Sequence, residues 1–484
     1  MNVDNKTNTD DKLWNKNQPL DRLIEKFTVG DDYKTDVVLV IADCVASLAH
    51  ANMLQGQGLI TRSELIELKE ALLIAIERAE QDQFIINRKD EDVHTALENF
   101  ISNKTAAGAK IHTGRSRNDQ IMAALRLYGR SGLNEIRSAV LRLTQSLLTF
   151  ATKYETVLMP GRTHTQIAMP SSLGLWASSF AEGLLDDLLL IKSCYELTDR
   201  SPLGSGAGYG VPLSLNREQV AKLLGFSCPI HNVLSASNSR GKLESITIDA
   251  IEQIALTLSR MAEDIILFSL PELGYFSLPV ELCTGSSIMP QKRNPDGLEL
   301  VRAKSAIING LGVSVKSVLR NLPSGYSRDL QETKKPYLSA FDIILGQLVV
   351  IDLTISKLEI NKENLKSSIT PELFATDYTF REVQRGTPFR EAYRLVAENL
   401  EASKNSGIFI NNLDEKDIFH RRSSTGSLGN LELSKCKKII EQEKNIVNID
   451  NHKIKESFYS LVGRDVKVFD NFWGKANYTN NTYT

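Results

Sequence analysis

The sequence predicts an all-α protein built around a central bundle of long helices. Apolar residues recur at steps of three and four, as in the stripe formed by Ile136, Val140, Leu143, Leu147 and Phe150, which is the spacing of one packed helix face. Four further stretches repeat the pattern, over residues 173–191, 251–268, 308–318 and 344–358. Alternating strand patterns are scarce, and the punctuating Gly and Pro residues fall between the periodic stretches. These observations favour an elongated antiparallel helical bundle.

The periodic stretches divide the chain into three regions. We expect an N-terminal helical domain over residues 1–112, with helical patterns over 37–54 and 62–80. The long-helix bundle follows over 113–361, and a small, more polar helical domain with shorter elements over 362–484. A chain of 484 residues is far longer than one ordinary domain, so a division of this kind is expected from its length.

The composition excludes several classes of function. The 57 Lys and Arg residues against 59 Asp and Glu give a net charge of −2, which provides no basic field for a nucleic acid or an anionic membrane. The polar N-terminus lacks the apolar core of a signal peptide, and no uninterrupted apolar run is long enough to span a bilayer. The cysteines show neither CxxC spacing nor a Cys/His cluster: Cys44, Cys194, Cys228, Cys283 and Cys436. We therefore expect a reduced, cytoplasmic protein without a metal, acting on a small molecule.

The most informative segment is the polar loop over residues 285–296, GSSIMPQKRNPD, which lies between two apolar helical stretches. Its Gly-Ser-Ser start favours mobility and its two prolines restrict the available conformations. The loop offers hydroxyls, cations and an amide to one ligand, from Ser286, Ser287, Lys292, Arg293 and Asn294. An ordinary surface loop has a similar composition, so composition alone leaves both interpretations open.

Three further polar segments flank predicted helices: HTGRSRND over 112–119, PGRTHTQ over 160–166 and GYSRDLQETKKP over 325–336. Free backbone N–H groups at the start of a helix favour a carboxylate, and His164 can exchange a proton near neutral pH. A capped helix start, a structural histidine and an exposed charged helix are the simpler explanations of the same residues.

A resemblance to a known family favours a functional interpretation of these segments over a structural one. GSSIMPQKRNPD resembles the signature loop shared by fumarases, aspartases, adenylosuccinate lyases and argininosuccinate lyases, and THTQ resembles the superfamily's Thr-His-x-Gln segment. HTGRSRND, preceded by EDVHTALE over 91–98, is similar to argininosuccinate lyases in particular. The resemblance covers roughly residues 37–430. It implies a fumarase/aspartase-like fold and a carbon–nitrogen lyase of arginine biosynthesis, which splits argininosuccinate into arginine and fumarate. The sequence shows no metal, flavin, nucleotide or pyridoxal signature, so we expect no cofactor.

The resemblance also implies roles for individual residues. Such a β-elimination needs a base for the Cβ proton, cations and N–H groups for the developing aci-carboxylate, and a proton for the departing nitrogen. By resemblance, Ser286 is the base, His164 the second proton-transfer group and Lys292 the stabilising cation, with the assignment of base and acid left open. The implied substrate-binding residues are Arg117, Asn118, Thr163, Asn294, Tyr326, Gln331 and Lys334, with Asp92 and Arg240 as further candidates.

Some positions depart from the family pattern. The family's Gly-Gly-Arg-Phe segment is absent after Trp14, and Asp32 stands where the family has a substrate-contacting serine. Arg240 is flanked by Ser239 and Gly241 instead of acidic residues, and Arg162 replaces a tyrosine. Two alternatives therefore stay open: a lyase that releases fumarate from another N-substituted succinate, and a non-catalytic, crystallin-like member of the family.

The positions of the motifs also bear on assembly. Each motif lies at or near the end of a predicted long helix, so motifs at opposite helix ends are far apart within one chain. The family resemblance implies a homotetramer whose active sites are shared between subunits. We expect Ser286 and His164 of one site to come from different chains.

Overall fold

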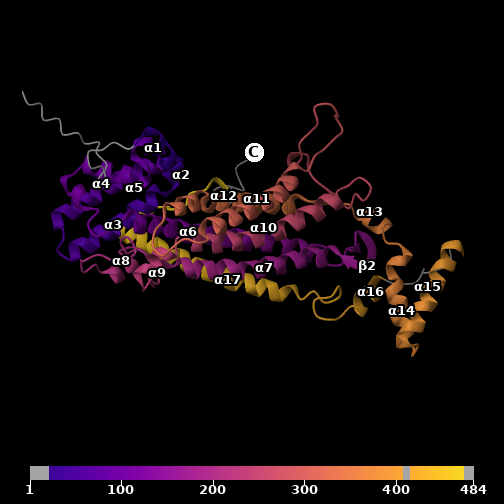
Figure 1. Cartoon of the computed structure of the whole chain (residues 1–484). Helices are drawn as coiled ribbons and strands as arrows, with labels where there is room; N and C mark the ends of the chain where they lie inside the picture. The colour runs from indigo at the N-terminus through magenta and orange to yellow at the C-terminus, as the bar shows by residue number, and fades with distance from the viewer. Residues whose placement is uncertain (1–20, 407–414, 474–484) are drawn as a thin grey trace, which may run out of the picture.

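The computed structural model describes residues 21–406 and 415–473, and it shows the predicted helical bundle. Five long helices match the five apolar stripes, and all run along the long axis of the molecule (Figure 1): α6 (Arg117–Lys153), α7 (Leu173–Thr198), α10 (Lys242–Phe268), α11 (Asp296–Leu319) and α12 (Lys334–Lys357). The apolar stripes form one continuous core, and Ile136, Val140, Leu143 and Leu147 are fully buried in it. The predicted all-α class and central bundle are confirmed.

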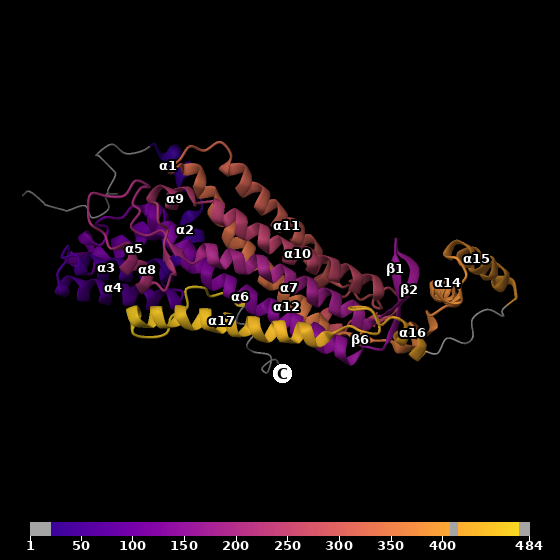
Figure 2. The same cartoon turned by 90° about the horizontal axis from the view of Figure 1, so that it is seen from below.

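Shorter helices pack against one end of the bundle, where Figures 1 and 2 show the N-terminal residues in indigo. They are α1 (Arg22–Val29), α2 (Asp32–Thr35), α3 (Val40–Gly56), α4 (Arg62–Glu80), α5 (Val93–Ser102), α8 (Arg217–Leu223) and α9 (Val233–Asn238). The short 3₁₀ helix η1 (Asp36–Leu39) joins α2 to α3. Helices α3 and α4 correspond to the predicted patterns over 37–54 and 62–80.

The strands of the described residues are short and form two-stranded pairs. β1 (Leu158–Thr163) and β2 (Gln166–Ser172) make an antiparallel hairpin between α6 and α7. β3 (Arg200–Ser201) pairs with β4 (Cys228–Pro229), and β5 (Phe276–Ser277) with β6 (Glu359–Ile360). These pairs join helix ends and leave the helical character of the fold unchanged.

The region beyond residue 361 contains both short helices and one long one. Four of the described helices lie towards and beyond one end of the bundle (Figure 1): α13 (Lys362–Ser367), α14 (Ala375–Gln384), α15 (Phe389–Ser406) and α16 (Glu415–Arg421). The expectation of short elements throughout is wrong, because α17 (Leu433–Val462) has 30 residues and lies along α6. The domain boundaries at 112 and 361 stay a proposal.

Buried charge contributes to the contact between α17 and α6. Arg137 of α6 is fully buried, and its Nη1 lies 2.6 Å from Asp450 Oδ2 of α17. Its Nη2 lies 3.9 Å from Glu443 of the same helix. α17 therefore docks partly through ion pairs, beside a buried apolar stripe at helical spacing that includes Ile440, Val447 and Ile454.

Close backbone approach fixes how α12 and the last described segment pack on α6. A Cβ at Gly132 would stand 2.7 Å from ring atoms of both Phe341 and Phe469. Those two rings also pack against Tyr128, with centroid separations of 5.9 and 4.8 Å. A larger residue at position 132 would force α12 and the Phe469 segment away from α6.

Two stretches reach the length and hydropathy of a membrane span, Arg22–Gly56 and Arg328–Lys357, with mean hydropathy values of 1.8 and 1.9. The expectation that no apolar stretch is long enough to span a bilayer was therefore too simple. In both, most of the apolar window is buried inside the protein, 78% and 61% respectively. Their hydropathy is that of core helices.

Candidate active site

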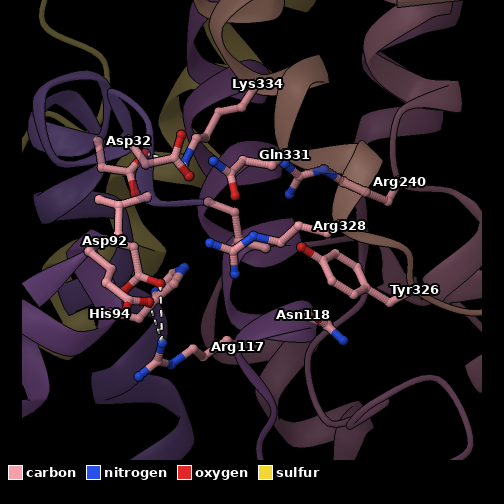
Figure 3. A pocket seen from close by; sticks show the side chains of 14 residues that line it. Asp32, Asp92, His94, Arg117, Asn118, Arg240, Tyr326, Arg328, Gln331 and Lys334 are labelled. Carbon is pink, nitrogen blue, oxygen red and sulfur yellow. Dashed lines mark ion pairs between the residues drawn. The ribbon is translucent and has the colours of Figure 1, made fainter. Parts of the chain in front are cut away.

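A charged pocket lies where the N-terminal helices meet the starts of α6 and α12. Its wall combines α2, η1, the start of α5, the segment before α10 and the 3₁₀ helix η5 (Arg328–Thr333). Four acids and four permanent cations line it (Figure 3): Asp32, Asp36, Glu91 and Asp92 with Arg117, Arg240, Arg328 and Lys334. A site with both signs of charge suits a ligand that itself carries both.

This pocket brings together seven of the predicted substrate-binding residues from four separate segments of the chain. They are Asp92, Arg117, Asn118, Arg240, Tyr326, Gln331 and Lys334. The remaining predicted residues do not line it: Thr163, His164, Ser286, Lys292 and Asn294. The candidate residues thus fall into two groups.

A capping box places Arg117 and Asn118 at the first turn of α6. Ser116 Oγ accepts a hydrogen bond from Asn118 N at 3.3 Å, and the carboxylate of Asp119 accepts one from Ser116 N at 2.9 Å. The second oxygen of Asp119 accepts from the backbone of Gly204 and Gly206, at 3.0 and 2.9 Å. Burial raises the pKa of Asp119 to about 6 despite these donors. Asp119 therefore ties the glycine-rich loop to the helix start that carries Asn118.

Arg117 and Asp92 form an ion pair on one side of the pocket (Figure 3). Arg117 Nη1 lies 3.6 Å from Asp92 Oδ2 and 3.9 Å from Glu91 Oε2. Asp92 also caps α5, because its Oδ1 accepts from Thr95 N at 2.8 Å. Burial would raise the pKa of Asp92, but the charges of His94 and Arg117 and the Thr95 hydrogen bonds outweigh it and lower that pKa. Both predicted residues are thus present in the pocket, paired with each other.

Lys334 is held by two carboxylates. Its ammonium lies 2.8 Å from Asp32 Oδ2 and 2.5 Å from Asp36 Oδ1, and the Lys334 side chain is 4% exposed. The other Asp36 oxygen accepts from Val93 N at 3.3 Å. Asp32, which we expected to stand in place of the family serine, is therefore a direct partner of the lysine predicted to bind substrate.

Sequence reasoning missed Asp36, His94 and Arg328. Arg328 lies inside a quoted motif, where its positive charge was the available signal, and its Nη2 donates to Thr28 O at 2.7 Å. His94 lies in the EDVHTALE segment, and its Nδ1 is 2.8 Å from Asp43 Oδ2. Burial would lower the pKa of His94, but the Asp43, Asp92 and Asp36 carboxylates raise it overall.

The second group of candidates lies at the opposite end of the bundle. Thr163, the last residue of β1, pairs with Gln166, the first residue of β2, so His164 and Thr165 form a two-residue turn. Both turn residues are left-handed, with φ of 52° and 62°, where glycine and asparagine are usual. Arg162 Nη1 donates to Thr165 O at 2.9 Å and supports the turn.

The Ser286 loop lies between α10 and α11, in a segment that projects from the bundle (Figure 1). Ser286 Oγ accepts hydrogen bonds from the backbone of Met289 at 3.2 Å and Ile288 at 3.4 Å. Asn294 pairs with Thr284 through the backbone, and its side chain donates to Gly285 O at 3.3 Å. The Lys292 side chain is exposed. Backbone N–H groups at the Ser286 oxygen are the donors that an alkoxide there would need.

One chain cannot bring the two groups together. Asn118 stands at the start of α6, His164 lies beyond its end, and the 37 residues of this helix span about 55 Å at 1.5 Å per residue. Arg240 and Ser286 are separated in the same way by α10 (Figures 1 and 2). Within residues 21–406 and 415–473, no three His, Cys, Asp or Glu side chains are grouped as a metal site.

The fold and these motifs are those of a lyase of the fumarase/aspartase superfamily. Residues 5–310 match the sequence model of a lyase family. An EDDS lyase variant with bound fumarate superposes with a TM-score of 0.76 at 22% identity, covering 91% of this chain and 94% of the other. A class II fumarase from Schistosoma mansoni gives a TM-score of 0.69 at 17% identity, covering 88% and 96%.

Sequence relatives identify one family within this superfamily. An argininosuccinate lyase from Thermotoga neapolitana is 45% identical over 395 residues, which is 81% of this chain and 99% of that protein. One from Phocaeicola vulgatus is 39% identical over 455 residues, 94% of this chain and 99% of the relative. The chain belongs to the argininosuccinate lyase family, and it is an enzyme of the carbon–nitrogen lyase class.

Proposed function

We propose that this enzyme cleaves argininosuccinate into arginine and fumarate in arginine biosynthesis, in the cytoplasm. The observation that carries the proposal is the pocket, which gathers seven substrate-binding candidates from motifs similar to those of argininosuccinate lyases. The names of the sequence relatives support the same reaction.

The proposed chemistry begins at Ser286. Its oxygen, activated by loop closure and by the Ile288 and Met289 N–H groups, removes the Cβ proton of the succinyl part. The released electron pair first resides on the neighbouring carboxylate as an aci-carboxylate, which Lys292 and Asn294 stabilise. It then forms the double bond of fumarate as the C–N bond breaks, and His164 protonates the departing guanidine nitrogen.

We further propose that the active sites are shared in a homotetramer. The roughly 55 Å length of α6 supports this, because Asn118 can meet His164 and Ser286 only if other copies supply them. Helix α11 supports it as well, since its Leu300 and Ile307 side chains, seven residues apart on one face, are 56% and 51% exposed in one chain. A second copy would cover this apolar face.

The test is to supply the purified enzyme with argininosuccinate, adenylosuccinate, aspartate and malate, and to follow fumarate by its ultraviolet absorbance. We expect fumarate from argininosuccinate alone. Fumarate from another of the four would assign a different leaving group, and no fumarate from any of them would favour a non-catalytic role.

A further inference from the structure

The hairpin that carries Thr163 and His164 depends on other parts of the chain for its direction. Among the described residues, β1 and β2 pair only with each other, at the end of the bundle away from the N-terminal helices (Figure 2). The tip of the hairpin, residues 163–167, is exposed in one chain. A single two-stranded hairpin is only marginally stable in water. The direction of the His164 imidazole therefore depends on contacts between the hairpin and the bundle.

Arg162, the residue before Thr163, makes one such contact. Its Nη1 donates to Thr165 O at 2.9 Å across the turn, and its Nη2 donates to the hydroxyl of Tyr275 at 3.4 Å. The nitrogens of a guanidinium lie in one rigid plane, so the two acceptors are held in a fixed relation to each other. Arg162 thus bridges the turn of the hairpin and a residue that follows α10.

Tyr275 is a rigid anchor for this bridge. It is 2% exposed, its N donates to Phe268 O at 2.9 Å, and its O accepts from Asn361 N at 3.0 Å. Its ring also packs on that of Phe268, with a centroid separation of 5.9 Å. Tyr275 is therefore part of the core of the bundle. A hydrogen bond to its hydroxyl fixes the hairpin turn relative to the end of α10.

The turn itself has an unfavourable backbone conformation. His164 and Thr165 both have positive φ, which costs about 1–2 kcal/mol for each residue that carries a side chain. The Thr165 hydroxyl donates to His164 O at 2.6 Å, and Thr165 O accepts from Arg162. Strained turns persist only where the surrounding contacts determine them. Without the bond from Arg162, the turn would relax and carry the imidazole with it.

We propose that Arg162 positions His164: by bridging the turn to Tyr275, it directs the imidazole towards the departing nitrogen of the substrate. This proposal rests on the function given above. In a site shared between subunits, His164 meets a substrate held by another chain, so its direction relative to its own bundle matters. We expected Arg162 to stand in place of a family tyrosine, whose single hydroxyl donor could not hold both acceptors.

A direct contact between Arg162 and the substrate is the competing role. Arg162 Nε is buried and has no hydrogen-bond partner among the described residues, so an acceptor on a ligand could use it. The two roles differ in their kinetics. Loss of a contact made equally in the ground state and the transition state raises KM, whereas loss of a positioning residue lowers kcat.

The kinetic test compares Arg162→Ala with the wild-type enzyme on argininosuccinate. We expect kcat to fall by about 10- to 100-fold, because a misplacement of about 1 Å can cost about 10²-fold in rate. KM should stay within about twofold, since no ground-state contact with the substrate is lost. A raised KM with an unchanged kcat would show direct binding and overturn the proposal.

Tyr275→Phe tests the other end of the bridge. This change removes the hydroxyl and keeps the ring packed on Phe268, so kcat should fall, by less than in Arg162→Ala. Added to Arg162→Ala, it should cause no further loss, because the two residues act through one hydrogen bond. Additive losses would contradict the bridge. Lys153→Ala is the matched control: it removes an exposed cation at the last residue of α6, close in sequence to the hairpin, and should keep the wild-type kcat.

Crystal structures separate this proposal from the lyase function. In Arg162→Ala, residues 163–167 should be displaced by about 1 Å or more, the scale that matters for catalysis, while Tyr275 keeps its place. A His164 side chain in its wild-type position would overturn the proposal even if the enzyme cleaves argininosuccinate. A displaced turn in an enzyme that cleaves none of the four substrates would support the bridge and refute the lyase function.

Discussion

Lys334 and Asp36 form an ion pair of 2.5 Å between side chains that are 4% and 0% exposed. Removing the lysine would leave Asp36 and Asp32 as adjacent carboxylates without a cation. A buried pair broken on one side typically costs about 3–5 kcal/mol, so we expect Lys334→Met to lower the free energy of unfolding by that amount.

The control for this prediction is Lys335→Met, in the same helical turn but exposed. Denaturant titration followed by circular dichroism compares the two variants. Similar midpoints for both would contradict a structural role for the Lys334 pair.

Ser286→Ala should remove nearly all turnover and leave the helical content unchanged, because the loop contributes little to the core. Acid–base groups typically contribute about 10²–10⁴-fold to rate. Ser287→Ala is the matched control, since this neighbouring hydroxyl is exposed, and it should retain activity. If Ser286→Ala keeps more than about a tenth of wild-type activity, Ser286 is not the base.

A mixture of His164→Asn and Ser286→Ala, unfolded and refolded together in equal amounts, should regain about one quarter of wild-type activity. If the two residues of a site come from different chains, random assembly leaves both intact with probability ½ × ½. Each variant refolded alone is the control and should stay inactive. Native mass spectrometry confirms mixed assembly, and a mixed but inactive assembly would rule out the shared site.

The left-handed turn of the β1–β2 hairpin predicts a gain in stability on substitution. Thr165 has a φ of 62°, which is unfavourable for a β-branched residue, so Thr165→Gly should stabilise the hairpin by about 1 kcal/mol. Gln166→Gly, in the adjacent extended strand, should instead destabilise it by about 0.5–1 kcal/mol. Thermal unfolding measures both, and shifts of the same sign would show that backbone strain is not the cause.

Stability should fall on acidification through His112. Burial, together with Arg115 and Arg117, lowers the pKa of His112 to about 4, whereas an unfolded histidine titrates near 6.5. The unfolded state therefore takes up the proton first, and the contribution of His112 is full above pH 6.5 and is lost as the pH falls towards 4.

His112→Asn should therefore reduce the stability lost between pH 6.5 and 5 by roughly 1 kcal/mol, allowing for a side chain that is 30% exposed. Denaturant midpoints at several pH values provide the measurement. His452→Asn is the control, because its side chain is 71% exposed, and it should leave the pH dependence unchanged. An unchanged slope in His112→Asn would contradict the prediction.

Helix positions were predictable because each bundle helix buries an apolar stripe at the helical period. The stripe of α17, which includes Ile440, Val447 and Ile454, gave the same signal and was overlooked. What the sequence could not show is that Asp450 and Glu443 of α17 meet the buried Arg137. Charged residues in a sequence are normally assigned to solvent, so such a contact has no local signature. Trp14 and the segment after it, where the sequence departs from the family, lie outside the described residues.

The site was predictable as a set of residue types and not as an arrangement. Arg117 and Tyr326 were expected from motifs, but their convergence with Asp36 depends on how distant helices pack. The partnership between Asp32 and Lys334 was likewise invisible, because the two positions are about 300 residues apart and neither motif refers to the other. Tertiary packing supplies this information.

The unbroken α6 helix also limits how the gene can change. One inserted codon within residues 117–153 would lengthen the helix by about 1.5 Å and rotate all that follows by about 100°. The stripe that packs against α7, α12 and α17 would then turn away from its partners along the remaining turns. We therefore expect insertions and deletions among descendants of this gene to be confined to the chain ends and connecting segments, while the length of α6 stays constant.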